Sequence, residues 1–398
     1  MSSLDPFILA ARQRELDRGL TVRFPVLSDR KRLRLLGSPH AFLRGSAPLF
    51  YEILAARPEL AEGPPGEGWI AGDMHLENVG AFPVDKERTV FDLNDFDDAF
   101  VAPLSLDLLR LSTSVLLAGR TFQCDGSAAI TLVERMIAAY LRGFGGGVAP
   151  PTPPKIAEML GRAEGRSRHA LLDGRAPRGR DGKRRFERGE RYLDLPAEIL
   201  AEVPALLRAY VEALGDRAPH HVGRWEVEDA AQRVAGTGSL GVLRIALLMR
   251  DKDGEERIVE IKEEHRSSVE ALVPVPADRW KSPGDRVVSA ARAMLAEPPR
   301  QLAGVNGAGL SFAARKLFPQ EDKLTIDEFQ TGTKLDAIVQ TIGHLLGKAH
   351  ARGVIERAPA PWTSAETAAL VDRAITMAGI FEAVYLAYAR GRREGAEA

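Results

Sequence analysis

One stretch of the chain has the residue types that phosphate chemistry uses. Residues 72–78 read GDMHLEN, which places Asp73 directly after a glycine and five positions before Asn78. A carboxylate can orient or deprotonate an attacking hydroxyl, and an amide oxygen is a hard ligand that suits Mg²⁺. The alternative is a polar turn in which these side chains cap backbone groups.

An acidic stretch follows a predicted strand. Residues 91–98 read FDLNDFDD, so Asp92, Asp95, Asp97 and Asp98 lie within seven positions. Carboxylates this close repel one another unless a cation lies among them. Mg²⁺ usually takes one or two carboxylates, and phosphate oxygens and water complete its shell, so a nucleotide would fit here. The alternative is an exposed, solvated turn, which the interspersed apolar residues disfavour.

A glycine-rich stretch, GTGSLG at residues 236–241, lies between two predicted strands. The dinucleotide-binding form of this motif needs a helix after the third glycine. Branched residues follow here, which favours the strand–loop–strand arrangement of a kinase glycine-rich loop. Lys262 lies on the next predicted strand, at a spacing that suits a lysine reaching back to the α- and β-phosphates. The alternative for Lys262 is a surface strand lysine.

Composition excludes several classes of protein. Lys and Arg total 54 against 55 Asp and Glu, which argues against a nucleic-acid coat protein. The single Cys124 excludes a disulfide framework and a thiolate zinc cluster. No run approaches the roughly 20 apolar residues that span a bilayer, and the first residues lack a signal peptide. We therefore expect a cytoplasmic protein with no nucleic-acid or membrane partner.

Hydrolase motifs are absent. The sequence has neither the HExxH of a zinc hydrolase nor the GxSxG of a serine hydrolase. An arginine-rich segment, 162–191, has eleven basic residues interrupted by five acids. We interpret it as a solvated loop or hairpin, with a nucleic-acid patch as the alternative.

These motifs need elements that hold them in place. Hydrophobic spacing predicts helices over 28–60, 103–140, 196–215, 286–297 and 335–353. Branched and aromatic runs predict strands over 89–93 and 310–318, and successive strands with tight turns over 225–263. Residues 145–154 read as a linker.

The motifs also resemble those of known families. GDMHLEN resembles the GDxHxxN catalytic loop of aminoglycoside phosphotransferases and related kinase-like proteins, and LNDFDDA resembles their metal-binding segment. More closely, the chain resembles the bacterial family called domain of unknown function 2252. The matching stretches are SPHAFLRG, GDMHLENVGAF, VFDLNDFDDA, LDLLRLSTS, VAGTGSLG, IKEEHRSS, RVVSAAR and GKAHARG.

The order of the motifs differs from that of kinase-like enzymes, in which the glycine loop and strand lysine precede the catalytic loop. A circular permutation explains the difference with one cut. The resemblance thus implies an α+β, bilobal, protein-kinase-like fold in permuted order. A small β-rich N-lobe would span 222–333, and a larger helical C-lobe would comprise 1–221 and 334–398.

The resemblance implies a role for each site residue. Asp73 would be the catalytic base, and Mg²⁺ would be held by Asn78 and by Asp95 as the main ligand, with Asp97 or Asp98 assisting. The nucleotide would be bound by Lys262 and by the loop residues Gly236, Thr237, Gly238, Ser239 and Gly241. Asp107 would brace the catalytic loop, His75 would support it, and Arg44 would contact phosphate or substrate or form a buried ion pair. The predicted helix 286–297 offers no glutamate partner for Lys262 before Glu297.

The implied function is an ATP- and Mg²⁺-dependent phosphotransferase acting on a hydroxyl of a small molecule or a protein. A nucleotidyltransferase in the same fold is one alternative. A nucleotide-binding pseudokinase that acts as a regulatory module is another. A metal-dependent phosphohydrolase would leave the glycine loop and Lys262 without a purpose. The sequence predicts neither the acceptor nor the oligomeric state.

Overall fold

The computed structural model describes residues 4–83, 88–119, 121–218, 225–275, 279–319, 321–326, 333–356 and 362–394. In these ranges the protein is a mixed α+β structure with one six-stranded sheet and two three-stranded sheets. The helices are α1 (Pro6–Thr21), α2 (Ser28–Leu35), α3 (Pro39–Arg44), α4 (Ala47–Ala56), α5 (Pro58–Ala61), α6 (Ser105–Ala118), α7 (Gly126–Phe144), α8 (Pro154–Glu164), α9 (Arg168–Arg175), α10 (Ala197–Leu214), α11 (Pro283–Met294), α12 (Thr333–Gly353) and α13 (Ser364–Glu394). The short 3₁₀ turns are η1 (Pro25–Leu27), η2 (Gly215–Arg217) and η4 (Ser268–Ala271).

The six-stranded sheet contains the predicted glycine-loop region. Its order is β5-β6-β7-β8-β10-β9, and all its neighbouring strands are antiparallel. The strands are β5 (Tyr192–Leu193), β6 (Glu226–Arg233), β7 (Arg244–Arg250), β8 (Glu256–Glu263), β9 (Ala303–Gly307) and β10 (Leu310–Lys316). Successive hairpins thus place residue 262 on β8, beside Arg244 of β7.

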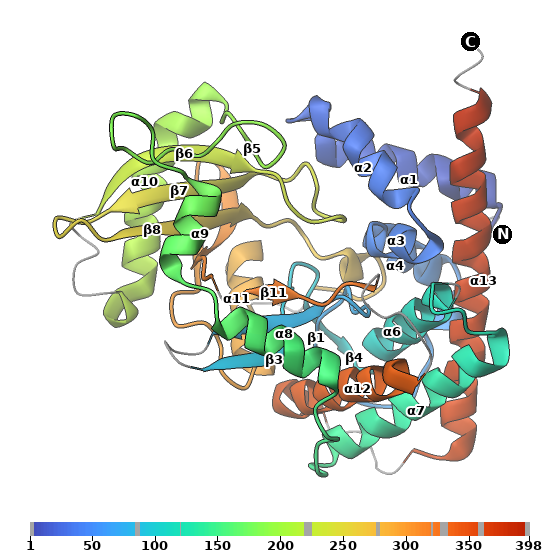
Figure 1. The fold of residues 1–398 in the computed structure, drawn as a ribbon. Coiled ribbons are helices and arrows are strands. Elements are labelled where there is room, and N and C mark those ends of the chain that lie inside the picture. Colours follow the sequence, from blue (N-terminus) through green and yellow to red (C-terminus); the bar gives the residue numbers. More distant parts are fainter. Residues whose placement is uncertain are drawn as a thin grey trace.

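Both faces of this sheet are covered, because side chains alternate along each strand. Ile245 and Leu247 of β7 pack with the apolar face of α10. Ala246 and Leu248 pack on the other face with Leu172 of α9. Figure 1 shows α10 behind these strands and α9 in front of them.

The rest of the described structure is mainly helical. The two small sheets have the orders β12-β1-β4 and β11-β2-β3. Their strands are β1 (Glu67–Ile70), β2 (Val79–Pro83), β3 (Thr89–Leu93), β4 (Phe100–Pro103), β11 (Asp322–Lys323) and β12 (Val354–Glu356). Helix α12 packs closely along α7, and α13 packs against α6 and α1. Figure 1 shows these helices on the opposite side of the molecule from the six-stranded sheet.

The predicted elements are largely present, although the predicted helices 28–60 and 103–140 are each divided. Helices α10, α11 and α12 and strands β3 and β10 lie within one to three residues of their predicted bounds. The predicted domain boundary at 221/222 lies outside the described residues, so the boundaries stay predictions. Strand β5 and helix α10 precede that boundary, and both pack with the six-stranded sheet. None of the described helices combines the length and apolar character needed to cross a membrane.

The arginine-rich segment differs from the predicted loop, because it contains the end of α8 and all of α9. Several of its arginines form ion pairs with acids of the six-stranded sheet. Arg178 and Arg184 both contact Glu256 of β8, at 2.9 and 2.8 Å, and Arg188 contacts Asp229 of β6 at 2.9 Å. These guanidinium groups hold the segment against the sheet.

Candidate active site

One pocket gathers almost all of the predicted site residues. It is lined by Arg44, Asp73, His75, Asn78, Asp95, Asp97, Gly236, Thr237, Gly238, Ser239 and Lys262. Gly241 and Asp107 do not line it. The residues come from five separate parts of the sequence, which the fold brings to one place.

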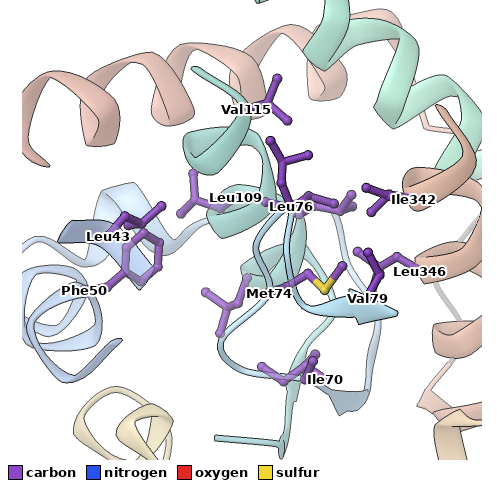
Figure 2. Packing of buried hydrophobic residues seen from close by; sticks show 14 of the residues in the cluster. Leu43, Phe50, Ile70, Met74, Leu76, Val79, Leu109, Val115, Ile342 and Leu346 are labelled. Carbon is purple, nitrogen blue, oxygen red and sulfur yellow. The ribbon is translucent and has the colours of Figure 1, made fainter. Parts of the chain in front are cut away.

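The loop at 71–78 is held in place by alternating side chains. Met74, Leu76 and Val79 are fully buried and pack against residues of α6 and α12, as Figure 2 shows. Asp73 and His75, the residues before and after Met74, therefore face the pocket. The buried apolar side chains thus anchor the loop, while its polar side chains line the pocket.

The start of this loop is fixed by backbone hydrogen bonds. The buried carboxylate of Asp107 accepts the N–H groups of Ala71 and Gly72 at 2.7 and 2.9 Å. Its Oδ2 lies 3.1 Å from Nε2 of His350, on α12. Gly72 has a positive φ of 76°, and a Cβ there would overlap the carbonyl oxygen of Asp98. The loop and the acidic segment are therefore in backbone contact.

Asp73 is held by Arg110, which sequence analysis did not identify. The fully buried guanidinium of Arg110 contacts Oδ1 of Asp73 through Nε at 2.7 Å and through a second nitrogen at 2.5 Å. Burial and the charges of Asp98 and Asp95 raise the pKa of Asp73 to about 7, against the opposing effect of Arg110. A carboxylate of that pKa is suited to accept a proton near neutral pH. Because both contacts use Oδ1, Oδ2 is the oxygen that can do so.

His75 is a neutral hydrogen-bond donor. Its Nδ1 accepts the backbone N–H of Glu77 at 3.1 Å, which places the proton of the neutral ring on Nε2. Burial and the charge of Arg44 hold the pKa of His75 well below its ordinary value. The ring of His40 packs edge-on against it, with the centroids 6.3 Å apart. His75 therefore contributes no positive charge to the pocket at neutral pH.

The four carboxylates of the acidic segment have different surroundings. Asp92 is buried away from the pocket, beside Arg352 at 3.7 Å. Asp98 accepts the backbone N–H of Ser268 at 2.6 Å and so fixes the start of η4. Asp95 and Asp97 line the pocket. Unlike Asp98, Asp97 has no backbone N–H bound to its carboxylate in the described residues. The segment thus presents Asp95 and Asp97 as candidate ligands.

These two carboxylates have opposite pKa shifts. Burial opposes the ionisation of Asp95, but the charge of Lys262 and a hydrogen bond from Asp97 outweigh it and lower the pKa of Asp95. Burial and the negative charge of Asp95 raise the pKa of Asp97 to about 6. The pair therefore attracts a cation strongly.

Asn78 supplies a further candidate ligand. Its Nδ2 donates to the carbonyl oxygens of Asp73 and Asp95, each at 3.2 Å, and this fixes the orientation of the amide. Its Oδ1 is buried and has no hydrogen-bond partner, and the whole residue is only 2% exposed. An unpaired buried acceptor is costly, so Oδ1 is suited to a cation ligand. In the described residues no three His, Cys, Asp or Glu side chains converge as a metal cage. One amide and two carboxylates fit Mg²⁺, which uses phosphate and water for its other positions.

Lys262 lies among these acids. Its Nζ forms an ion pair with Oδ2 of Asp97, and it lies 3.9 Å from Oδ1 of Asp95 and 3.7 Å from Oε1 of Glu264. Burial opposes its charge, but the acids around it outweigh burial and raise the pKa of Lys262. The lysine is therefore a permanent positive charge that lines the pocket.

The glycine loop lies between β6 and β7 and is held through its carbonyl groups. The buried ammonium of Lys31 donates to the carbonyl oxygens of Thr237 and Gly238 at 3.3 and 2.5 Å. Arg34, also on α2, donates to the carbonyl of Gly236. Gly241 has a φ of 105°, and a Cβ there would overlap the carbonyl oxygen of Leu20. Gly241 thus serves the contact with α1 and not the pocket.

Helix α11 contacts the acidic segment through a buried arginine. Arg286 is fully buried. It donates to the carbonyl oxygens of Asp97 and His265 at 2.7 and 2.9 Å, and to that of Ala99. The helix therefore fixes the backbone of the acidic segment instead of pairing with Lys262.

Arg44 forms the ion pair that the sequence left open, and its contact with phosphate or substrate stays a prediction. Its guanidinium forms an ion pair with Glu77, and it also lines the pocket. The pocket has further lining residues that sequence analysis missed, among them Gln13, Leu16 and Leu20 of α1 and Glu264. The inward positions of α1 are Ala10, Gln13, Asp17 and Thr21. Because most of these are polar, no hydrophobic period marks the helix.

The chain was compared with known protein families, curated proteins and solved structures. The model of the family described as "Uncharacterized protein conserved in bacteria (DUF2252)" matches residues 23–392. No curated protein and no solved structure matches the chain. The matched region contains the loop at 71–78, the acidic segment, the glycine loop and Lys262. The chain therefore belongs to this bacterial DUF2252 family.

Proposed function

We propose that the protein is an ATP- and Mg²⁺-dependent phosphotransferase that acts on a hydroxyl of a small molecule or a protein. The observation that carries the proposal is the common pocket of Asp73, Asn78, Asp95, Lys262 and the glycine loop. Phosphoryl transfer asks mainly for positioning and neutralisation of charge. A base, candidate metal ligands and a positively charged lysine meet that demand.

Chain topology supports a kinase-like fold in permuted order. The glycine loop, the strand of Lys262 and helix α11 follow one another along the chain, as in kinase-like enzymes. Helix α12 leads into β12, which pairs with β1, the strand immediately before the catalytic loop. His350 of α12 also contacts Asp107, which holds that loop. Helix α12 resembles the segment that precedes the catalytic loop in kinase-like enzymes, and in this chain its C-terminal end lies beside that loop.

The residues have distinct tasks in this proposal. Asp73 accepts the proton of the acceptor hydroxyl through Oδ2 while Arg110 holds Oδ1. Asn78, Asp95 and Asp97 would hold Mg²⁺, which when bound neutralises charge on the phosphates. Lys262 binds the α- and β-phosphates, and the glycine loop covers them.

Calorimetry with ATP and Mg²⁺ tests this proposal. We expect wild-type protein to bind MgATP with micromolar affinity, and Asp95→Ala and Lys262→Ala to weaken binding by at least about ten-fold. Asp73→Asn should keep binding and lose about 10²–10⁴-fold in transfer rate, because it removes only the base. The control is Lys252→Ala, an exposed lysine on the turn between β7 and β8.

Labelled ATP separates the alternatives. Transfer of label from the γ-phosphate supports the phosphotransferase, whereas transfer from the α-phosphate indicates nucleotidyl transfer. Binding without transfer to any acceptor indicates a pseudokinase. Absence of nucleotide binding in the wild type would overturn the proposal.

A further inference from the structure

The ammonium group of Lys262 stands where a cation is needed. It is paired directly with Asp97 and lies 3.9 Å from Asp95. Both carboxylates line the pocket, as does Asn78, whose Oδ1 is unpaired. One positive charge therefore already offsets part of the negative charge that a divalent cation would use.

The acids cannot easily leave this position, because their backbone is fixed. Arg286 binds the carbonyl groups of Asp97 and Ala99 from α11. Asp98, the next residue, is fixed to the N–H of Ser268. The mobile partner is Lys262, whose charge sits at the end of a flexible four-carbon stem.

Lys262 also has a third acid within reach. Glu264 lies two residues further along the chain, just beyond the end of β8, and its Oε1 is 3.7 Å from the ammonium. It is buried and lines the same pocket. Burial and the charge of Asp97 raise the pKa of Glu264, so it offers the ammonium a carboxyl oxygen and not a lasting negative charge. The lysine can thus leave Asp97 without losing every oxygen partner.

A divalent cation without a nucleotide meets an incomplete site. No three His, Cys, Asp or Glu side chains converge in the described residues. Such an ion must therefore displace the ammonium and keep several water ligands. Phosphate oxygens would both accept the ammonium and complete the metal shell.

We propose that Lys262 occupies the cation position at Asp95 and Asp97 in the nucleotide-free protein, so that it competes with a divalent metal until nucleotide phosphates bind the ammonium. The inference rests on the proposed function for the identity of Asp95 and Asp97 as metal ligands. Its consequence is that removal of the lysine improves binding of the metal alone.

The test is titration with Mn²⁺ in the absence of nucleotide, with free Mn²⁺ measured by electron paramagnetic resonance. Lys262→Met should bind Mn²⁺ about ten-fold more tightly than wild type, since a unit charge in contact with the ligands is removed. Lys262→Gln should show the same gain, and it provides a second measurement if the Met variant does not fold. Adding Asp97→Asn to either variant should abolish the gain.

The matched control is Arg266→Gln. Arg266 lines the same pocket but pairs with Glu270, at 2.6 Å, and not with the candidate ligands. It should keep the wild-type affinity for Mn²⁺. An equal gain in Mn²⁺ affinity in Arg266→Gln would show that the effect comes from net charge alone, and it would overturn the proposal.

Two other results would also overturn it: Mn²⁺ affinity in folded Lys262 variants no greater than that of wild type, or a gain that survives Asp97→Asn. The outcome is independent of catalysis, because no nucleotide is present. A protein that never transfers phosphate could still show the gain. A working phosphotransferase could equally lack it.

Discussion

At the scale of single residues, charge pairing decides what each buried acid can do. Glu260 of β8 is 2% exposed and has three arginines around it. It forms an ion pair with Arg233 and lies 3.5 and 3.6 Å from Arg244 and Arg315. Burial opposes its charge, but the arginines outweigh burial and hold its pKa well below the ordinary 4.5.

We therefore predict that Glu260→Gln lowers the free energy of unfolding by about 3–5 kcal/mol at neutral pH, because it leaves buried guanidinium groups without their anion. Chemical denaturation measures this loss. Since the pKa is lowered on folding, the contribution is complete above the ordinary pKa and declines as pH falls from there towards the folded pKa. The difference between wild type and variant should thus shrink below about pH 4.5.

Two results would contradict this account: an unchanged difference in strongly acidic solution, or no loss at neutral pH. The matched control is Asp181→Asn, which makes the same chemical change. Asp181 pairs at 2.7 Å with Arg185 on the surface. It should leave the unfolding free energy almost unchanged.

At the scale of elements, the loop at 71–78 depends on close contact between two backbones. Gly72 has a φ of 76°, and its missing Cβ leaves room for the carbonyl of Asp98. Gly146 has nearly the same φ, 78°, with nothing within 4 Å of a Cβ built there. Substitutions at the two glycines therefore separate the energetic cost of backbone strain from the cost of steric overlap.

We predict that Gly146→Ala costs about 1–2 kcal/mol of stability, which is the cost of a left-handed conformation for a residue with a Cβ. Gly72→Ala should cost clearly more and should also weaken MgATP binding, because it separates the loop from Asp95 and Asp97. Thermal melting and calorimetry measure the two effects. Equal losses of stability in the two variants would show that the overlap with Asp98 has no consequence.

How much of the structure the sequence predicts depends on the kind of signal. Helix α12 has regular apolar spacing and lies almost within its predicted bounds, and strands β7 and β8 lie within the predicted run of strands over 225–263. Helix α1 was not predicted, because its inward face contains Gln13, Asp17 and Thr21.

The candidate site was likewise only partly predictable from the sequence. The side chains that line the pocket are marked by local motifs such as GDMHLEN. The residues that hold them are not, because Arg110 and Arg286 act across long sequence separations. Only the folded chain places these arginines beside their partners.

At the scale of the whole molecule, one buried polar cluster joins distant helices to the glycine loop. Asp17 of α1 lies 3.6 Å from Lys31 of α2 and accepts hydrogen bonds from Gln13 at 2.9 Å and from the Tyr388 hydroxyl of α13 at 3.1 Å. Lys31 then binds the carbonyl groups of Thr237 and Gly238. Figure 1 shows the first and last helices lying against each other.

We predict that Lys31→Met increases hydrogen exchange of the backbone N–H groups at 236–241, because the loop loses two hydrogen bonds. Mass spectrometry of exchanged peptides measures this change. Arg32→Gln is the control on the same helix, since Arg32 pairs at 3.3 Å with the exposed Asp29. Unchanged exchange in Lys31→Met would mean that the loop is fixed without Lys31, by the bond from Arg34 to Gly236 and the packing of Gly238 and Gly241.

The position of Tyr388 has a further consequence for the order in which a growing chain becomes competent. A chain is synthesised from its N-terminus, and its early parts can fold first. Asp73, the acids and the glycine loop all emerge from the ribosome before α13. The hydroxyl that completes the cluster behind the loop arrives after all of them. A nascent chain would therefore hold every pocket residue and still lack the finished support of its glycine loop.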